Sequence, residues 1–99
     1  MTSESDLWIM ANALCKLKAE KANFTSRDFS HLAAGVYPEK CMRFLTVIRM
    51  SGKFGLIRLG SVPAPRAVPV SRRVLVYYGF KEDTDDYTPE DIIKWWQRS

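Results

Sequence analysis

The sequence predicts a single α+β domain, in which three helices precede a β-hairpin and a short helix follows it. Two observations favour this class of fold. Apolar residues recur at helical spacings of three and four in the first half of the chain, whereas residues 54–59 and 73–78 are rich in residues typical of strands. A proline-rich stretch separates these strand-like runs, and a capped helix start follows them near the C-terminus.

Length and composition limit the classes of protein. The 99 residues fit one domain, and the 46% apolar share supports a core, although a domain of this size gains from dimerisation. No apolar run is long enough to span a membrane, and the polar, acidic N-terminus is unlike an export signal. Cys15 and Cys41 lie far apart in apolar patterns, so we expect reduced thiols in a cytoplasmic protein.

Charge is distributed unevenly along the chain. Eight basic residues and no acidic one lie between residues 40 and 80: Lys40, Arg43, Arg49, Lys53, Arg58, Arg66, Arg72 and Arg73. The sign then reverses over residues 82–91, which carry six acidic side chains. A polyanion is attracted to the first stretch and repelled by the second, which favours a nucleic-acid partner over a solvated basic surface with no partner.

The first two helices are predicted from an apolar stripe and a capping box. Ser5 is the expected N-cap of the first helix, whose core face carries Leu7, Met10, Leu14 and Leu17. This periodicity is too short to favour a coiled-coil dimer seam. Thr25 and Asp28 form a capping box that opens a second helix over about residues 26–34. Its inner face is expected to bury Phe29, Leu32 and Ala33.

A third helix is predicted between two glycines. Gly35 can adopt the left-handed conformation that ends the second helix, and Pro38 suits the first position of the third. Gly52 marks the end of the third helix. Its core stripe is formed by Cys41, Leu45 and Ile48, flanked by Phe44.

The two strand-like runs are expected to form a hairpin with a stiff loop. Residues 60–71 join the runs and contain Pro63, Pro65 and Pro69. Prolines prevent regular ladder pairing and favour an extended conformation, so the loop is predicted to be a rigid basic wing. A disordered linker is the alternative, but two flanking apolar strands fit a hairpin better.

The C-terminal segment, residues 81–99, is predicted to be an acidic turn followed by a helix, outside the main domain of residues 1–80. Thr88 is the expected N-cap and Pro89 the first helical residue. One face of this helix carries Ile92, Trp95 and Trp96. A helix this short is marginal alone, so we expect this face to pack on the first helix or to form a dimer or partner interface.

The inventory of reactive residues argues against an enzyme, a cofactor or a metal. The chain's one histidine, His31, has no metal-ligand spacing to Cys15 or Cys41. No phosphate-binding glycine loop is present. The acidic group of Asp83, Asp85 and Asp86 lacks the glycine and distal glutamate of a calcium loop, which favours a solvated turn.

The central part of the chain resembles the winged helix-turn-helix family of transcriptional regulators, from about Leu7 to Tyr78. The matching residues are Thr25, Asp28, Phe29, Leu32, Gly35, Pro38, Glu39, Arg43, Leu45, Gly52, Leu56 and Ile57. The resemblance implies a three-helix core with a β-hairpin wing that binds double-stranded DNA. The small size is similar to that of phage or bacterial regulators of transcription or replication.

The same resemblance implies roles for individual residues. Arg43 would contact guanine, with Glu39, Lys40 and Thr46 alongside. The full expected DNA surface is Ser26, Arg27, Tyr37, Glu39, Lys40, Arg43, Thr46, Arg49, Lys53, Arg66, Arg72 and Arg73. Within it, the residues at the helix ends and on the wing would hold phosphates. Edge-strand protection is the alternative role for Arg72 and Arg73.

Two departures from the family pattern favour a second hypothesis. Tyr37 stands at a cap position where serine or threonine is usual, and Met42, Val47 and Met50 make the outer side of the third helix unusually apolar. These residues suit a winged helix that binds protein, as an inhibitor or adaptor of a nucleic-acid machine. A partner would then bind at Met42, Met50 or the C-terminal helix.

Overall fold

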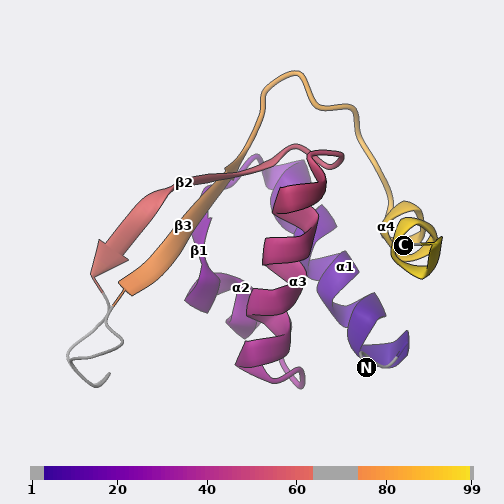
Figure 1. Cartoon of the computed structure of the whole chain (residues 1–99), viewed down its shortest axis with the longest axis horizontal. Helices are drawn as coiled ribbons and strands as arrows, with labels where there is room; N and C mark the ends of the chain where they lie inside the picture. The colour runs from indigo at the N-terminus through magenta and orange to yellow at the C-terminus, as the bar shows by residue number, and fades with distance from the viewer. Residues whose placement is uncertain (1–3, 64–73, 99) are drawn as a thin grey trace.

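The computed structural model describes residues 4–63 and 74–98. Within these residues the chain forms four helices and a three-stranded antiparallel sheet, so the predicted α+β class is confirmed. The elements in chain order are α1 (Glu4–Glu20), β1 (Phe24–Thr25), α2 (Ser26–Leu32), α3 (Pro38–Ser51), β2 (Leu56–Pro63), β3 (Val74–Phe80) and α4 (Pro89–Arg98). Figure 1 shows α1, α2 and α3 gathered at the centre, with the sheet extending to one side and α4 at the other.

The starts of α1 and α2 test two capping predictions. Thr25 Oγ1 accepts the Asp28 backbone N–H at 3.1 Å, and Asp28 Oδ2 accepts the Thr25 N–H at 3.0 Å, which confirms the capping box. The expectation for Ser5 is wrong, because α1 already includes Glu4 and Ser5 lies inside the helix. The apolar stripe of α1 is buried as predicted: Leu7, Met10, Leu14 and Leu17.

The end of α2 differs from its prediction. The helix ends at Leu32, two residues early, and Leu32 is 41% exposed instead of buried. Ala33 takes the C-cap position, where its N–H donates to the Phe29 carbonyl at 2.9 Å and its side chain is buried. Since the chain leaves the helix at Ala33, Leu32 is turned away from the core. Gly35 has a φ of 96°, and it lies in the turn after the helix.

The sheet has the order β1-β3-β2, so the last strand lies between the first two. Its register pairs Phe24 with Tyr78 on one side of β3, and Leu56 with Phe80 on the other. The hairpin ladder is longer than predicted, because β2 continues to Pro63. Proline was expected to exclude pairing there, but β2 is an edge strand of this sheet, and edge strands tolerate proline.

The core lies where the three central helices, the sheet and α4 meet. Its fully buried side chains are Met10, Leu14, Phe24, Phe29, Cys41, Phe44, Leu45, Ile48 and Ile92. The inner faces predicted for α1 and α3 are therefore confirmed. Cys15 and Cys41 are free thiols, with Cys41 buried and Cys15 half-buried.

The C-terminal helix packs on its own chain. Thr88 and Asp91 form a second capping box, with Thr88 N–H to Asp91 Oδ2 at 2.9 Å and Asp91 N–H to Thr88 Oγ1 at 3.3 Å. Helix α4 contacts α1, and the Trp96 ring stacks on Phe44 of α3 at 5.5 Å between centroids. Ile92 is 0% exposed, and Trp95 and Trp96 are half-buried against the core. This face therefore packs on α1, which is the first of the two arrangements predicted for it.

Replacing Ile92 by alanine is expected to lower the free energy of unfolding by about 2–5 kcal/mol, because it leaves a cavity between α4 and α1. Urea unfolding at several protein concentrations measures this loss. The midpoint should not depend on concentration, because Ile92 is already buried within one chain. Gln97→Ala on the exposed side of α4 is the control, with an expected change within about 0.5 kcal/mol. A cost for Ile92→Ala as small as that of the control would contradict the packing.

Candidate nucleic-acid interface

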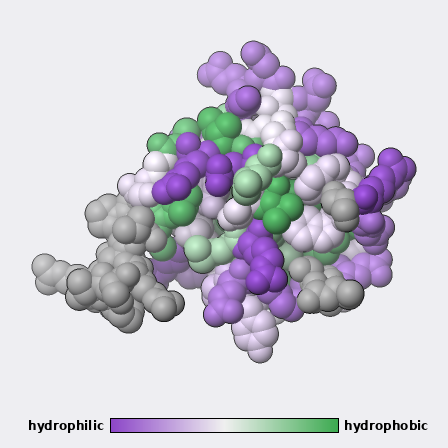
Figure 2. All heavy atoms as spheres, viewed as in Figure 1, coloured by the Kyte–Doolittle hydropathy of each residue, from purple (hydrophilic) through white to green (hydrophobic). Residues whose placement is uncertain are grey.

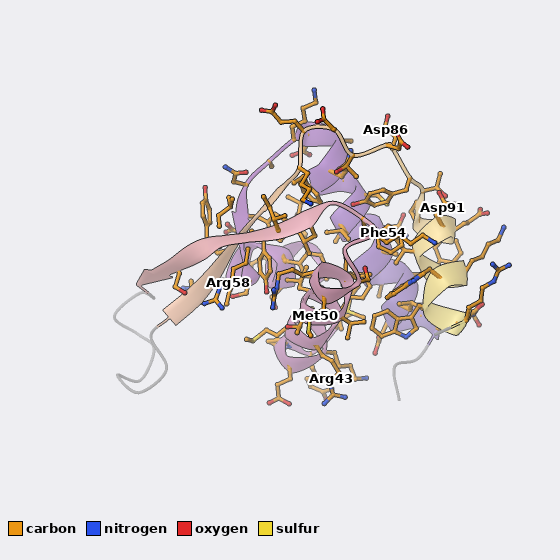
Figure 3. All side chains as sticks on the ribbon, turned by 45° about the horizontal axis from the view of Figure 1, so that its top comes forward. Arg43, Met50, Phe54, Arg58, Asp86 and Asp91 are labelled. Atoms are coloured by element: carbon orange, nitrogen blue, oxygen red, sulfur yellow. The ribbon has the colours of Figure 1, made fainter. Side chains whose placement is uncertain are left out.

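Helix α3 is the element that presents the candidate site. Pro38 occupies its first turn after the N-cap Tyr37, and Gly52 ends it in the left-handed conformation, with a φ of 67°. Cys41, Phe44, Leu45 and Ile48 are buried on the inner side. Because successive residues on a helix turn by about 100°, the residues between them face solvent. Figure 3 shows Arg43 projecting from α3 away from the rest of the molecule.

The outer side of α3 mixes charged and apolar residues. Glu39, Arg43 and Thr46 are exposed, as the sequence predicted. Met50 is 73% exposed and Met42 is 50% exposed. Figure 2 shows charged and apolar residues interleaved on the side of the molecule where α3 lies in front. The predicted outer surface of α3 is therefore accessible, and it is as apolar as its sequence indicated.

The N-terminal end of α3 is less available for DNA than expected. The ammonium of Lys40 forms an ion pair with Asp6 of α1, with Nζ and Oδ2 2.9 Å apart. The same ammonium lies 6.0 Å from the centroid of the Tyr37 ring, which is 74% exposed. The sequence placed Lys40 beside Arg43 as a base contact. In the structure the ion pair with Asp6 links Lys40 of α3 to α1, and its role as a base contact stays a prediction.

The start of α2 also differs from its expected role. Ser26 is only 6% exposed, so its hydroxyl does not face a phosphate at the surface. The Thr25 cap turns Ser26 inward as the first residue of the helix. Arg27, the next residue, is exposed and keeps its expected position. An apolar groove of about 380 Å³ runs beside them and is lined by Ser26, Arg27, Ser30, His31, Pro38, Met42 and Leu75.

The C-terminal end of α3 carries a basic cleft. Its volume is about 340 Å³, and its lining residues are Arg49, Gly52, Gly55, Leu56, Ile57, Arg58 and Lys81. Arg49 comes from α3, Arg58 from β2 and Lys81 from the residue after β3. No carboxylate is among these lining residues. The cleft therefore brings together three cations, from α3, from β2 and from the segment after β3.

The sequence prediction included Arg49 but missed Arg58 and Lys81 as site residues. Pairing of Leu56 with Phe80 places the residues just outside the two strands side by side, and the Lys81 N–H donates to the Gly55 carbonyl at 2.9 Å. The two predicted strand-like runs, residues 54–59 and 73–78, end before Lys81, so the sequence carried no signal for this juxtaposition. Lys81 was instead grouped with the acidic segment that follows it.

The tyrosine at the centre of the sheet lies beneath this surface. Tyr78 is 3% exposed and stacks on Phe24 at 5.4 Å. Burial raises the pKa of the Tyr78 hydroxyl, while the charges of Arg49 and Arg58 and a hydrogen bond with Thr46 act to lower it. Thr46 and the charges of the two arginines therefore act on the ionisation of one buried hydroxyl.

The remaining residues of the predicted DNA surface are Lys53 and the three arginines of the wing. Lys53 lines a neighbouring cavity of about 560 Å³ that also carries Asp91. A backbone hydrogen bond from Thr88 is the main cause that holds the pKa of Asp91 below its usual range, and the charges of Lys94 and Lys53 act in the same direction. Lys53 therefore lines a cavity that also carries carboxylates, and its expected contact with a phosphate stays a prediction. The wing residues Arg66, Arg72 and Arg73 lie outside the described residues.

Comparisons with known proteins give no family for the chain. No model of a protein family matches it, and no curated protein or solved structure matches it either. Among the residues described by the structure, no cluster of three or more histidine, cysteine, aspartate or glutamate side chains is arranged to hold a metal ion. In the same part of the chain, no helix has the length and apolar character needed to cross a membrane. The surface around α3 is thus the candidate site on its own geometry.

Replacing Tyr78 by phenylalanine is expected to cost about 1 kcal/mol of unfolding free energy at neutral pH, because the hydrogen bond between its hydroxyl and Thr46 is lost. The raised pKa of Tyr78 also makes the free energy of unfolding depend on pH. Stability from the protonated hydroxyl is fully present below about pH 10 and is lost as the pH rises through the raised value. The wild-type chain should therefore lose more stability than Tyr78→Phe between about pH 8 and about pH 11.

Urea unfolding at both pH values measures this difference. Tyr77→Phe, on the opposite face of the same strand, is the matched control. Equal alkaline losses in the wild-type chain and in Tyr78→Phe would show that the hydroxyl does not contribute in this way.

Proposed function

We propose that the chain is a winged helix protein that binds double-stranded DNA, with α3 in the major groove and the β2–β3 hairpin against the backbone. The order of its elements, α1-β1-α2-α3-β2-β3, and its sheet order, β1-β3-β2, support this fold. The major groove of B-DNA is wide enough to admit one helix, braced by a scaffold behind it. In this chain α1 and α2 would form that scaffold.

The observation that carries the proposal is the separation of charge across the molecule. Arg43, Arg49 and Arg58 lie on α3 and the hairpin, whereas the exposed carboxylates of Asp83, Asp85 and Asp86 lie in the segment before α4. Figure 3 shows Arg58 on the hairpin side of the molecule and Asp86 and Asp91 on the α4 side. A polyanion approaching this field is turned toward α3 and the hairpin.

The geometry supports distinct roles along α3. Arg43 is central and exposed, so it would reach a base edge, where bidentate contact with guanine suits its planar head group. Glu39 and Thr46 lie one turn on either side of it. Arg27 on α2 would contact a phosphate across the groove. The function would be regulation by occupancy of a DNA site, without a chemical step.

Arg43→Ala tests the base contact. A duplex pool enriched for binding is compared with the unselected pool by fluorescence anisotropy across a salt series. Loss of one base contact is expected to weaken binding to the enriched duplex by about 1–3 kcal/mol, with a smaller effect on the unselected pool. Lys16→Ala on the exposed side of α1 is the control. A wild-type chain that binds neither pool at low salt would refute the proposed function.

A protein partner is the second candidate, and the exposed methionines favour it. Met50 is 73% exposed, and Met42 borders the apolar groove between α2, α3 and β3. Methionine is common on surfaces that adapt to protein partners. In this second proposal α3 would dock on another protein through the same outer side.

Met50→Lys separates the two candidates, because it adds a positive charge to the outer side of α3. If this side meets DNA, duplex affinity should rise and the slope of log affinity against log salt should steepen by about one unit. Ala19→Lys adds the same charge to an exposed position of α1 and should change the slope little. If Met50→Lys leaves duplex binding at the level of Ala19→Lys, the α3 surface is not the DNA contact and the protein-binding function is favoured.

A further inference from the structure

The basic cleft at the C-terminal end of α3 has the features of a site for a single phosphate. We infer that it binds one phosphodiester group of the DNA backbone through Arg49, Arg58 and Lys81, an inference that rests on the proposed function. Two of these residues, Arg58 and Lys81, lie outside the DNA surface expected from the family resemblance. The site therefore adds an anchoring point at a place where the chain folds three separate elements together.

The first argument is the absence of a counter-charge. Within the described residues, Arg49, Arg58 and Lys81 form no ion pair, and the cleft that they line contains no carboxylate. Three like charges around about 340 Å³ repel one another, and a bound anion relieves that repulsion. The C-terminal dipole of α3 opposes an anion, but it amounts to only about half a charge against three full ones.

The second argument is that one of the two arginine head groups is already held by a hydrogen bond. Arg58 Nη2 donates to Ser61 Oγ at 2.9 Å, which holds its side chain beside the hairpin. Arg49 from α3 and Arg58 from β2 line the same cleft, so the two side chains reach it from different elements. An arginine side chain held in this way can bind two phosphate oxygens with less entropy lost on binding.

The third argument concerns the place of Lys81. Its backbone N–H is bonded to the Gly55 carbonyl at 2.9 Å, so the base of this side chain is fixed at the mouth of the cleft. Lys81 also borders the cavity that carries Asp83, Asp85, Asp86 and Asp91, yet it forms no ion pair with any of these carboxylates in the described structure. Its ammonium is therefore free to add a point charge to the two arginines.

The position of the cleft has a consequence for docking. It lies beyond the last turn of α3, at the junction with the hairpin, and Arg43 lies two turns earlier in the helix. A phosphate in the cleft and a base at Arg43 would together fix the direction in which α3 runs along the groove. Backbone contacts set register and orientation in this way, although they carry no base information.

Lys81→Gln is the test, because Lys81 is exposed and its replacement leaves the core intact. Binding to an unselected duplex pool is measured by fluorescence anisotropy across a salt series, with Lys16→Gln on α1 as the charge-matched control. The expected result is weaker binding to all sequences and a slope of log affinity against log salt that is lower by about one unit. Lys16→Gln should keep the wild-type slope.

A second measurement distinguishes a backbone phosphate from a free one. Inorganic phosphate is titrated at constant ionic strength while the backbone amide signals of Gly52, Gly55 and Lys81 are followed by NMR. If the wild-type chain binds duplex DNA and Lys81→Gln keeps its affinity and slope, the inference is overturned and the proposed function stands. Saturation of these amide signals by free phosphate, together with unchanged duplex binding by Lys81→Gln, would assign the cleft to a free anion and likewise overturn the inference. If the wild-type chain binds no duplex, the proposed function and this inference both fail.

Discussion

A continuous series of aromatic contacts connects the sheet to the last helix, and the position of α3 depends on it. Among the described residues, the series runs through Tyr78, Phe24, Phe29, Phe44, Trp96, Trp95, Phe54 and Tyr87. Successive ring centroids lie between 5.0 Å and 6.3 Å apart. Each such pair contributes about 0.5–1.5 kcal/mol beyond the burial of its area. In a small domain with little stability to spare, these contacts are a large part of what fixes the elements relative to one another.

The series also determines which side of α3 faces solvent. Phe44 lies between Phe29 of α2 and Trp96 of α4, so α3 cannot rotate about its axis without breaking both stacks. Arg43 precedes Phe44 in the helix and is turned by about 100° from it, to the exposed side. At the other end of the series, the Tyr78 hydroxyl lies close to Thr46 and the arginines of the cleft. The core thus supports both the central and the C-terminal parts of the candidate surface.

Local patterns were enough to predict most of the fold, because caps, stripes and strand-like runs depend on neighbours in sequence. The capping box at Thr25, the N-cap at Thr88, the first turn at Pro38 and the stop at Gly52 are all present as expected. The site was predicted less well, since it depends on partners that are distant in the chain. Lys40 is 34 residues from Asp6 in sequence, and no periodic pattern of residues indicates an ion pair over this separation. Lys81 lies at the cleft because the register of the hairpin pairs Leu56 with Phe80.

The same long-range contacts make the two ends of α3 unlike each other. At the N-terminal end, the dipole favours an anion, but Asp6 already neutralises Lys40 and Ser26 of α2 is buried. At the C-terminal end, the dipole is unfavourable, yet three cations without a carboxylate line the cleft. Full charges outweigh the half charge of a helix end, so the stronger attraction for a phosphate lies at the C-terminal end. A symmetric arrangement, with phosphates held equally at both ends of α3, is therefore not what these contacts favour. Under the proposed function, α3 would be anchored at its C-terminal end beside the hairpin, and Arg43 would be the residue directed at the bases.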